Sequence, residues 1–209
     1  GLVGSEMCIR DSNIFSLIYH FLFAVSSSVI GAIVASWPLL FIFMIVQKTY
    51  ETVHMSLFKV MHNYNQLMFY LLWPFKKQLK MDNFPTSANA AEHFAECKHL
   101  FILTLLVFII CIIVHFVFKR QKKKLLLNLD KSVALILLLL PIIIFPFAVT
   151  NFDSFFVIFH HILFNNSDWL FDPNTDPIIN VLTEGFFASC FAVAGVIYEL
   201  YFAEKLLRK

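Results

Sequence analysis

Histidine and carboxylate side chains gather in one stretch of an otherwise apolar chain, residues 152–176. The stretch reads FDSFFVIFHHILFNNSDWLFDPNTD and holds two adjacent histidines, His160 and His161, with no lysine or arginine. Apolar runs flank it on both sides, and ionisable residues close to a membrane are functional candidates by default. An imidazole can accept or donate a proton near neutral pH. The stretch is therefore the first candidate for an acid–base site.

A third histidine, His93, lies in another loop that the topology described below predicts on the same face of the membrane. One histidine from each loop can then meet at one surface and work as a proton-transfer pair. The other five histidines are better explained by packing or by solvation: His20, His54, His62, His99 and His115. The sequence contains no GxSxG, HExxH or P-loop motif, and no serine or cysteine is placed as an obvious nucleophile.

The aspartates of the same stretch admit more than one interpretation. A carboxylate that accepts an imidazole N–H fixes the tautomer of the ring. Asp172 and Asp176 each precede a proline, however, and Asp-Pro dipeptides favour turns. Histidine and aspartate together also suit zinc or manganese, but the spacing matches no standard ligand motif. We therefore expect no metal and no other cofactor.

Composition indicates an integral membrane protein. The 209 residues are 59% hydrophobic and 14% charged, whereas soluble domains have about 25% charged residues. The net charge of +2 is too small to suggest nucleic acid as a partner. Four widely separated cysteines predict neither a disulfide framework nor a cysteine-based zinc site. The expected fold class is an all-α integral membrane protein.

About four apolar runs are long enough to cross the hydrocarbon core of a bilayer. The expected spans are residues 14–36, 100–118, 133–149 and 186–203. They form a single membrane domain, residues 13–209, while residues 1–12 resemble a translated sequencing adapter and are excluded from the predicted fold.

Two helical features are expected between the first two spans. The apolar segment after Pro38 either extends the first span past a kink or lies in the membrane interface. Apolar residues at helical spacing up to Trp73 predict an amphipathic surface helix. Ser87 is the predicted N-cap of the helix that continues into the second span.

Basic residues set the expected orientation. Residues 119–131 hold six of the sixteen lysines and arginines, and positively charged connections stay cytoplasmic. Both termini are then cytoplasmic, and the loops of residues 39–99 and 150–185 face outward. These two loops form an extracellular cap that carries His93 and His160.

Three blocks of the sequence resemble the signature of the bacterial lipoprotein intramolecular transacylase family. They are NYNQLMFYL, FPTSANAAEHFAECKHLF and FDSFFVIFHHILFNNSDWLFDPNTDPIINVLTEGFF, in this order. The last block has the Phe-Asp, the Phe-His, the Asn-rich turn, the Trp and the Phe-Asp-Pro-x-x-Asp-Pro run of that signature. The resemblance implies an enzyme of the bacterial cell membrane that moves the sn-2 acyl chain of a diacylglyceryl-cysteine lipoprotein to its N-terminal amine, giving lyso-form lipoprotein.

The same resemblance implies roles for individual residues. His160 is the expected general base and acid, and His93 either assists proton transfer or donates to the oxyanion; which does which stays open. Candidate orienting or substrate-binding residues are Asp153, Asn166, Trp169, Asp172, Asp176 and Tyr64. His161 lies outside the motif. The implied partners are a diacylated lipoprotein and membrane lipid, with no nucleic acid.

Two other functions stay open from the residues alone. A non-catalytic membrane sensor or lipid-binding protein would use the acidic loop as a binding surface and would tolerate replacement of His160. A metal-dependent membrane hydrolase would lose its activity to a chelator.

Overall fold

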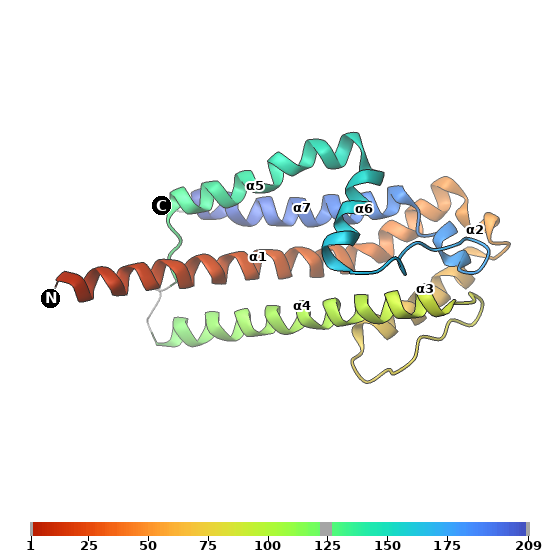
Figure 1. Cartoon of the computed structure of the whole chain (residues 1–209), viewed down its shortest axis with the longest axis horizontal. Helices are drawn as coiled ribbons and strands as arrows, with labels where there is room; N and C mark the ends of the chain where they lie inside the picture. The colour runs from red at the N-terminus through yellow and green to blue at the C-terminus, as the bar shows by residue number, and fades with distance from the viewer. Residues whose placement is uncertain (1, 122–126, 208–209) are drawn as a thin grey trace. The chain divides into compact units, whose positions relative to one another are not determined.

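The computed structural model describes residues 2–121 and 127–207, with side chains from residue 13 onward, and every regular element in these ranges is a helix (Figure 1). The elements are α1 (Leu2–Gln47), α2 (Thr49–Thr52), α3 (Leu57–Leu72), α4 (Ala88–Arg120), α5 (Lys131–Thr150), α6 (Phe152–Leu163), the 3-10 turn η2 (Pro177–Asn180) and α7 (Glu184–Leu207). The predicted all-α fold class is confirmed.

Four of these helices are long and apolar enough to cross a membrane. They are Asn13–Gln47 within α1, Ala88–Arg120, Lys131–Thr150 and Glu184–Leu207. They follow the order of the four predicted spans, so the protein is a multi-pass membrane protein. Each helix is longer than its predicted span because the turns at its ends stay helical in less apolar sequence. The predicted cap of α4 is confirmed, since the Ala90 amide donates to Ser87 Oγ at 3.1 Å.

Helix α1 does not end at Pro38. It continues as one helix to Gln47, so the apolar segment after the proline extends the first span. Proline removes one backbone donor, which apolar spans tolerate when neighbouring groups satisfy the backbone. Close to the proline, Ser36 Oγ donates to the Ile33 carbonyl at 2.6 Å.

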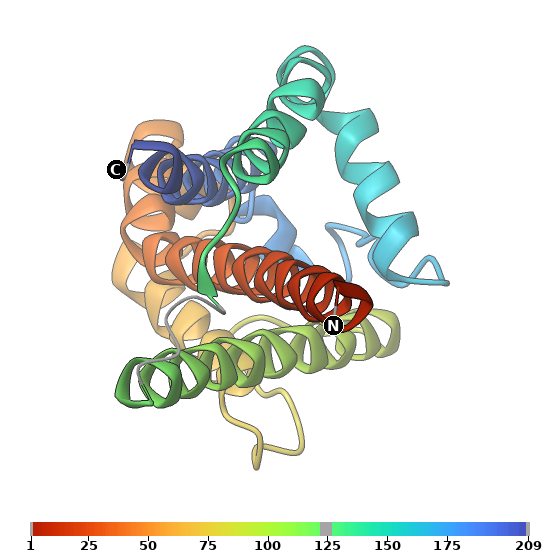
Figure 2. The ribbon, with the colours of Figure 1, turned by 90° about the vertical axis from the view of Figure 1, so that its left-hand side faces the viewer.

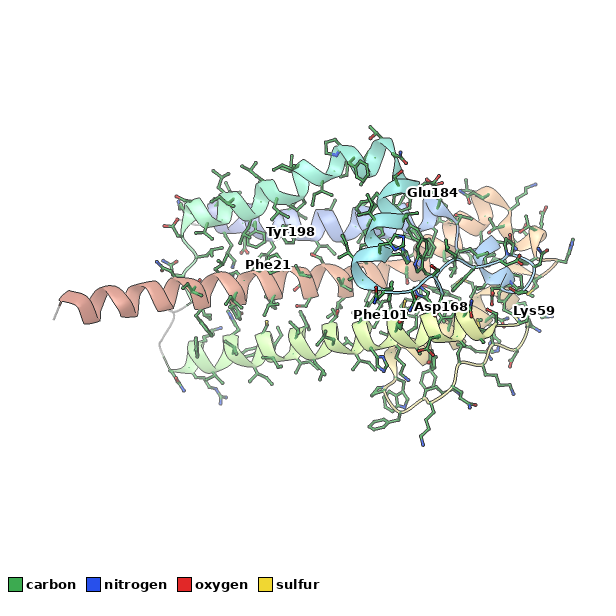
Figure 3. The ribbon with its side chains drawn as sticks, viewed as in Figure 1. Phe21, Lys59, Phe101, Asp168, Glu184 and Tyr198 are labelled. Carbon is green, nitrogen blue, oxygen red and sulfur yellow. The ribbon has the colours of Figure 1, made fainter. Side chains whose placement is uncertain are left out.

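Two compact units are separable, and the long helices contribute residues to both. Unit 1 comprises residues 1–32, 104–146 and 193–209, and unit 2 comprises residues 33–103 and 147–192. Within unit 1, α1 lies between α4 on one side and α5 with α7 on the other (Figures 1 and 2). The core of unit 1 joins Ala24 of α1, Leu137 of α5 and Phe202 of α7, with Tyr198 of α7 (labelled in Figure 3) packed among them.

Unit 2 contains the predicted amphipathic surface helix, which the structure resolves as α3 after the Ser56 N-cap. Its Tyr64 hydroxyl donates to Ser36 Oγ of α1 at 2.6 Å, and the Tyr64 ring meets Trp37 edge-on at 5.9 Å. The Trp37 indole N–H donates to Asn65 Oδ1 at 2.8 Å. These contacts pack α3 against the end of α1 that belongs to this unit.

Phenylalanines hold α6 against the start of α7 in the same unit. Phe155 and Phe159 both meet Phe191 edge-on, at 5.1 and 4.9 Å between ring centroids, and Phe156 lies 5.3 Å from Phe187. Edge-to-face aromatic pairs add about 0.5–1.5 kcal/mol each beyond the area that they bury. This packing fixes the rotation of α6 and therefore the direction of the side chains on its other face.

Candidate active site

His160 lies near the end of α6 and is the one residue of that helix that is buried. Its Nδ1 lies 2.7 Å from the Phe156 carbonyl, one turn earlier. Because a carbonyl oxygen only accepts, Nδ1 carries the hydrogen, and the neutral ring keeps its lone pair on Nε2. Burial lowers the pKa of His160, the Phe156 hydrogen bond raises it, and nearby His161 lowers it, with a net fall below 6.5. Near neutral pH the ring is therefore a neutral base.

His93 lies in the second turn of α4 and is 7% exposed, the same fraction as His160. Its Nε2 faces Cys97 Sγ one turn later, at 3.4 Å. Its Nδ1 is buried and has no hydrogen-bond partner among the described residues. Buried polar atoms in folded proteins are nearly always paired, so an unpaired imidazole nitrogen marks a place where a ligand atom is expected.

The two imidazoles lie next to each other. Their ring centroids are 5.7 Å apart at an interplanar angle of 37°. Phe164 packs against both rings, with centroid distances of 4.7 Å to His93 and 5.7 Å to His160, and Phe171 lies 5.6 Å from His93. The aromatic surround excludes water from the rings, which strengthens any hydrogen bond that they make to a reacting group.

Asn166, in the loop after α6, connects the two histidine-bearing elements. Its Nδ2 donates to Glu96 Oε1 of α4 at 2.8 Å, and its backbone carbonyl accepts the indole N–H of Trp169 at 3.1 Å. Trp169 is 8% exposed, and its ring lies 4.7 Å from His160. Asp168, labelled in Figure 3, belongs to the same loop and donates its amide to Asn166 Oδ1 at 3.1 Å.

The two aspartates that precede prolines behave differently. Asp176 is 3% exposed and fastens the loop to the start of α4, because its Oδ1 accepts the Ser87 amide at 2.7 Å. Its other oxygen accepts the Thr175 hydroxyl at 2.8 Å. Asp172 is exposed and accepts two bonds from Asn174, each at 2.9 Å, which is the turn-forming role that its sequence context also allows.

Three further candidate residues, Asp153, Tyr64 and His161, make contacts of other kinds. Asp153 is exposed in the first turn of α6, seven residues before His160, and about 10 Å of helix rise separates the two. Tyr64 packs α3 on α1, and burial raises the pKa of its hydroxyl. His161 is exposed, and its ring meets that of Trp169 edge-on, with 5.5 Å between the ring centroids.

Two residues of the site were not predicted from the sequence as site residues: Glu96 and Cys97. Both follow His93 on one helix, by three and by four residues, and this spacing brings side chains to one face. The spacing is visible in the sequence as soon as a helix is assumed from Ser87 onward. Its significance depends on the partners, Asn166 and the His93 ring, which only packing reveals.

The part of the chain that the structure describes contains no group of three or more histidine, cysteine, aspartate or glutamate side chains that could hold a metal ion. The thiol of Cys97 lies within hydrogen-bond distance of His93, and the carboxylate of Glu96 is bound by Asn166 of the neighbouring loop. The chemistry that this arrangement supports is proton transfer and hydrogen-bond donation by two imidazoles.

The model of one protein family matches this chain over residues 14–187; its description is "Lipoprotein intramolecular transacylase Lit". No curated protein sequence matches.

Solved structures of the membrane-integral lipoprotein intramolecular transacylase Lit from Bacillus cereus have the same fold. One is 22% identical, with a TM-score of 0.77, and the match covers 94% of this chain and 93% of that chain. A histidine-to-arginine variant is 22% identical with a TM-score of 0.73, covering 98% and 93%. A histidine-to-alanine variant is 21% identical with a TM-score of 0.68, covering 97% and 93%.

The family match extends over most of the chain and includes His93, His160, α3 and the loop that carries Trp169. This protein belongs to the lipoprotein intramolecular transacylase family.

Proposed function

We propose that this protein transfers the sn-2 acyl chain of a diacylglyceryl-cysteine lipoprotein to the free N-terminal amine of the same molecule. The observation that carries the proposal is the pair of buried, adjacent imidazoles in a member of this family, His93 and His160, with ring centroids 5.7 Å apart. The reaction needs a base for the attacking amine and a donor for the carbonyl oxygen. His160 has Nε2 available to accept the proton, and His93 has Nδ1 available to donate a hydrogen bond, so the two imidazoles can fill both roles.

His160 is the proposed base. Its Nδ1–H is committed to the Phe156 carbonyl, so the lone pair on Nε2 is available to take a proton from the amine. Its lowered pKa keeps most of the rings unprotonated at neutral pH. The imidazolium that forms can then protonate the departing glycerol oxygen, and His160 therefore acts first as base and then as acid.

His93 is the proposed oxyanion donor. A neutral thiol has one S–H to donate, and donation from Cys97 to His93 Nε2 places the ring hydrogen on Nδ1. This Nδ1 is the buried atom without a partner. It can donate to the carbonyl oxygen as that oxygen becomes negative, which is worth about 10²- to 10³-fold for a single donor.

The bonds balance without a covalent enzyme intermediate. The N–C amide bond forms as the C–O ester bond breaks, the glycerol oxygen gains a hydrogen, and the additional proton of the ammonium is released. Because amine and ester belong to one molecule, holding them together makes the reaction unimolecular. Trp169 and Asn166 support this role by fixing His160 and the adjoining loop.

The proposed setting is the outer face of a bacterial cell membrane, with both termini cytoplasmic. The support is the concentration of basic residues in the connection between α4 and α5. A cysteine introduced by Lys122→Cys should resist a membrane-impermeant thiol reagent added to intact cells. Efficient labelling there would reverse the orientation and contradict the proposed location of the site.

The activity is tested in a bacterium that makes diacylated lipoproteins and lacks this enzyme. Expression of the chain should convert the N-terminal tryptic lipopeptide from the diacylglyceryl form to the N-acyl lyso form, which fragmentation in a mass spectrometer distinguishes. If the expressed protein accumulates in the membrane and the lipopeptide stays diacylated, the proposed function is wrong.

A further inference from the structure

We propose that Glu96 binds the protonated N-terminal amine of the substrate and so makes the enzyme selective for lipoproteins whose amine is free. This inference rests on the proposed function, because it assigns to Glu96 one of the two reacting groups of that substrate. It adds an ammonium-binding residue to a site in which only the proton-transfer groups had been assigned.

The first argument is an incomplete set of hydrogen bonds. Glu96 Oε1 accepts from Asn166 Nδ2 at 2.8 Å, whereas Oε2 is buried and has no partner among the described residues. An ionised carboxylate has two oxygens that accept and none that donates. A buried acceptor left open costs free energy, unless a bound ligand completes it. The ligand atom that fits is an N–H donor.

The second argument is charge. The one partner of Glu96 is a neutral amide, and no lysine, arginine or histidine forms an ion pair with it in the described part of the chain. Lys98, two residues later on α4, is directed elsewhere: its Nζ donates to the Lys76 carbonyl and lies 4.5 Å from the Tyr70 ring centroid. A partly buried carboxylate without a cation is complementary to a ligand that carries one.

The third argument is position. Glu96 follows His93 by three residues on α4, which places the two side chains on one face of the helix. Through Asn166 it is also joined to Trp169, whose ring packs on His160. A cation held by Glu96 is therefore held on the His93 face of α4, next to the loop whose Trp169 packs on His160.

The Glu96 carboxylate also distinguishes the substrate from the product by charge. The substrate amine is an α-amine with a pKa of about 7.7–8.0, so it carries a positive charge at neutral pH. Transfer of one proton to His160 Nε2 frees the nitrogen lone pair for attack, and the amide that forms has no charge. The interaction with Glu96 is thus lost as the reaction completes, which favours release of the N-acyl product.

Binding of two unreactive analogues tests the inference separately from catalysis. Both are dialkyl lipopeptides in which ethers replace the esters, so that no acyl chain can move; one has a free N-terminal amine and the other is N-acetylated. The wild-type enzyme should bind the free-amine analogue about 10- to 100-fold more tightly, as expected for a hydrogen bond between charged groups. In Glu96→Gln this ratio should fall to about 1, whereas Glu96→Asp should keep part of it.

Glu92→Gln is the matched control, since Glu92 lies one turn earlier on α4 and is exposed. This variant should retain the wild-type binding ratio. If Glu96→Gln does not fold, the wild-type enzyme alone still tests whether the site recognises the charge of the amine. Binding of the free-amine analogue should weaken between pH 6.5 and 9.5, while binding of the N-acetylated analogue should not.

Equal binding of the two analogues by wild-type enzyme, or an unchanged ratio in folded Glu96→Gln, overturns the inference. Either result can occur in an enzyme that makes the lyso product normally, so the proposed function would survive it. Conversely, a wild-type enzyme that makes no lyso product contradicts the proposed function itself, and the inference falls with it.

Discussion

Replacing the His160 side chain with an amide should remove its basic nitrogen while leaving the local packing nearly intact. In His160→Asn the amide nitrogen takes the place of Nδ1 and can still donate to the Phe156 carbonyl, which lies 2.7 Å from Nδ1 in the native protein. No group replaces Nε2. His160→Gln does the reverse, since its amide reaches toward the Nε2 position but has no proton affinity near neutral pH.

The expected loss follows from the proposed role. A positioned general base contributes about 10²- to 10⁴-fold to the rate, which corresponds to about 3 to 5 kcal/mol of activation free energy. Both variants should therefore fall to about 1% of wild-type activity or below. The paired control is His161→Asn, because His161 is adjacent on α6 but exposed; it should retain activity within about threefold.

The assay is the initial rate of conversion of diacyl lipopeptide to N-acyl lyso-lipopeptide by purified enzyme in detergent, quantified by mass spectrometry. Thermal unfolding of each variant shows whether the fold persists. If His160→Asn unfolds at the wild-type temperature and retains more than about a tenth of the rate, His160 is not the base. The loop would then be better explained as a scaffold or a lipid-binding surface.

Three further predictions concern stability, pH and metal. Asp176→Ala should lower the free energy of unfolding by about 1–3 kcal/mol because it leaves the partly buried Ser87 amide unpaired, whereas Asp172→Ala should cost less than about 1 kcal/mol. Chemical denaturation in detergent compares the two variants, and equal losses would contradict the assigned roles. Burial is the main cause of the lowered pKa of His160, so the rate should fall on acidification only below about pH 6.5. The charge of His161 also lowers the pKa of His160, so in His161→Ala this fall in the rate should begin at slightly higher pH. A pH–rate profile in which the fall moves to lower pH would refute the assignment of His160 as the base. Treatment with a chelator should leave the rate unchanged, and a loss restored by added zinc would favour a metal-dependent hydrolase.

The spans could be predicted from sequence because bilayer thickness sets a minimum length for an apolar helix. Their ends could not, because polar residues continue a helix whenever neighbouring elements pack against it. Pro38 is the clearest instance: its local chemistry suggests an interruption, yet α1 runs through it to Gln47. Packing of Tyr64 and Trp37 at this part of α1 is information that no local window contains.

The candidate site, like the spans, could be predicted from the sequence only in part. The motif pointed to His93 and His160, and the structure places their rings 5.7 Å apart; their catalytic roles stay predictions. It also pointed to Asp153, which is exposed at the start of α6, and to Tyr64, which packs α3 on α1. Such a motif reports that a residue matters without saying whether it matters for chemistry or for packing. Glu96 was missed because its meaning depends on a partner far along the chain.

The bond between Asn166 and Glu96 joins residues that are 70 positions apart in sequence, and this distance has a consequence for biosynthesis. At about 5–20 residues per second, a ribosome needs about 4 to 14 s to make the second partner after the first. For most of this interval α4 has been synthesised in full, but His93 and Glu96 have neither the opposing imidazole nor the amide that orients them. On the proposed function, a nascent chain cannot act on lipoproteins until α6 and the loop after it have been made and have packed against α4.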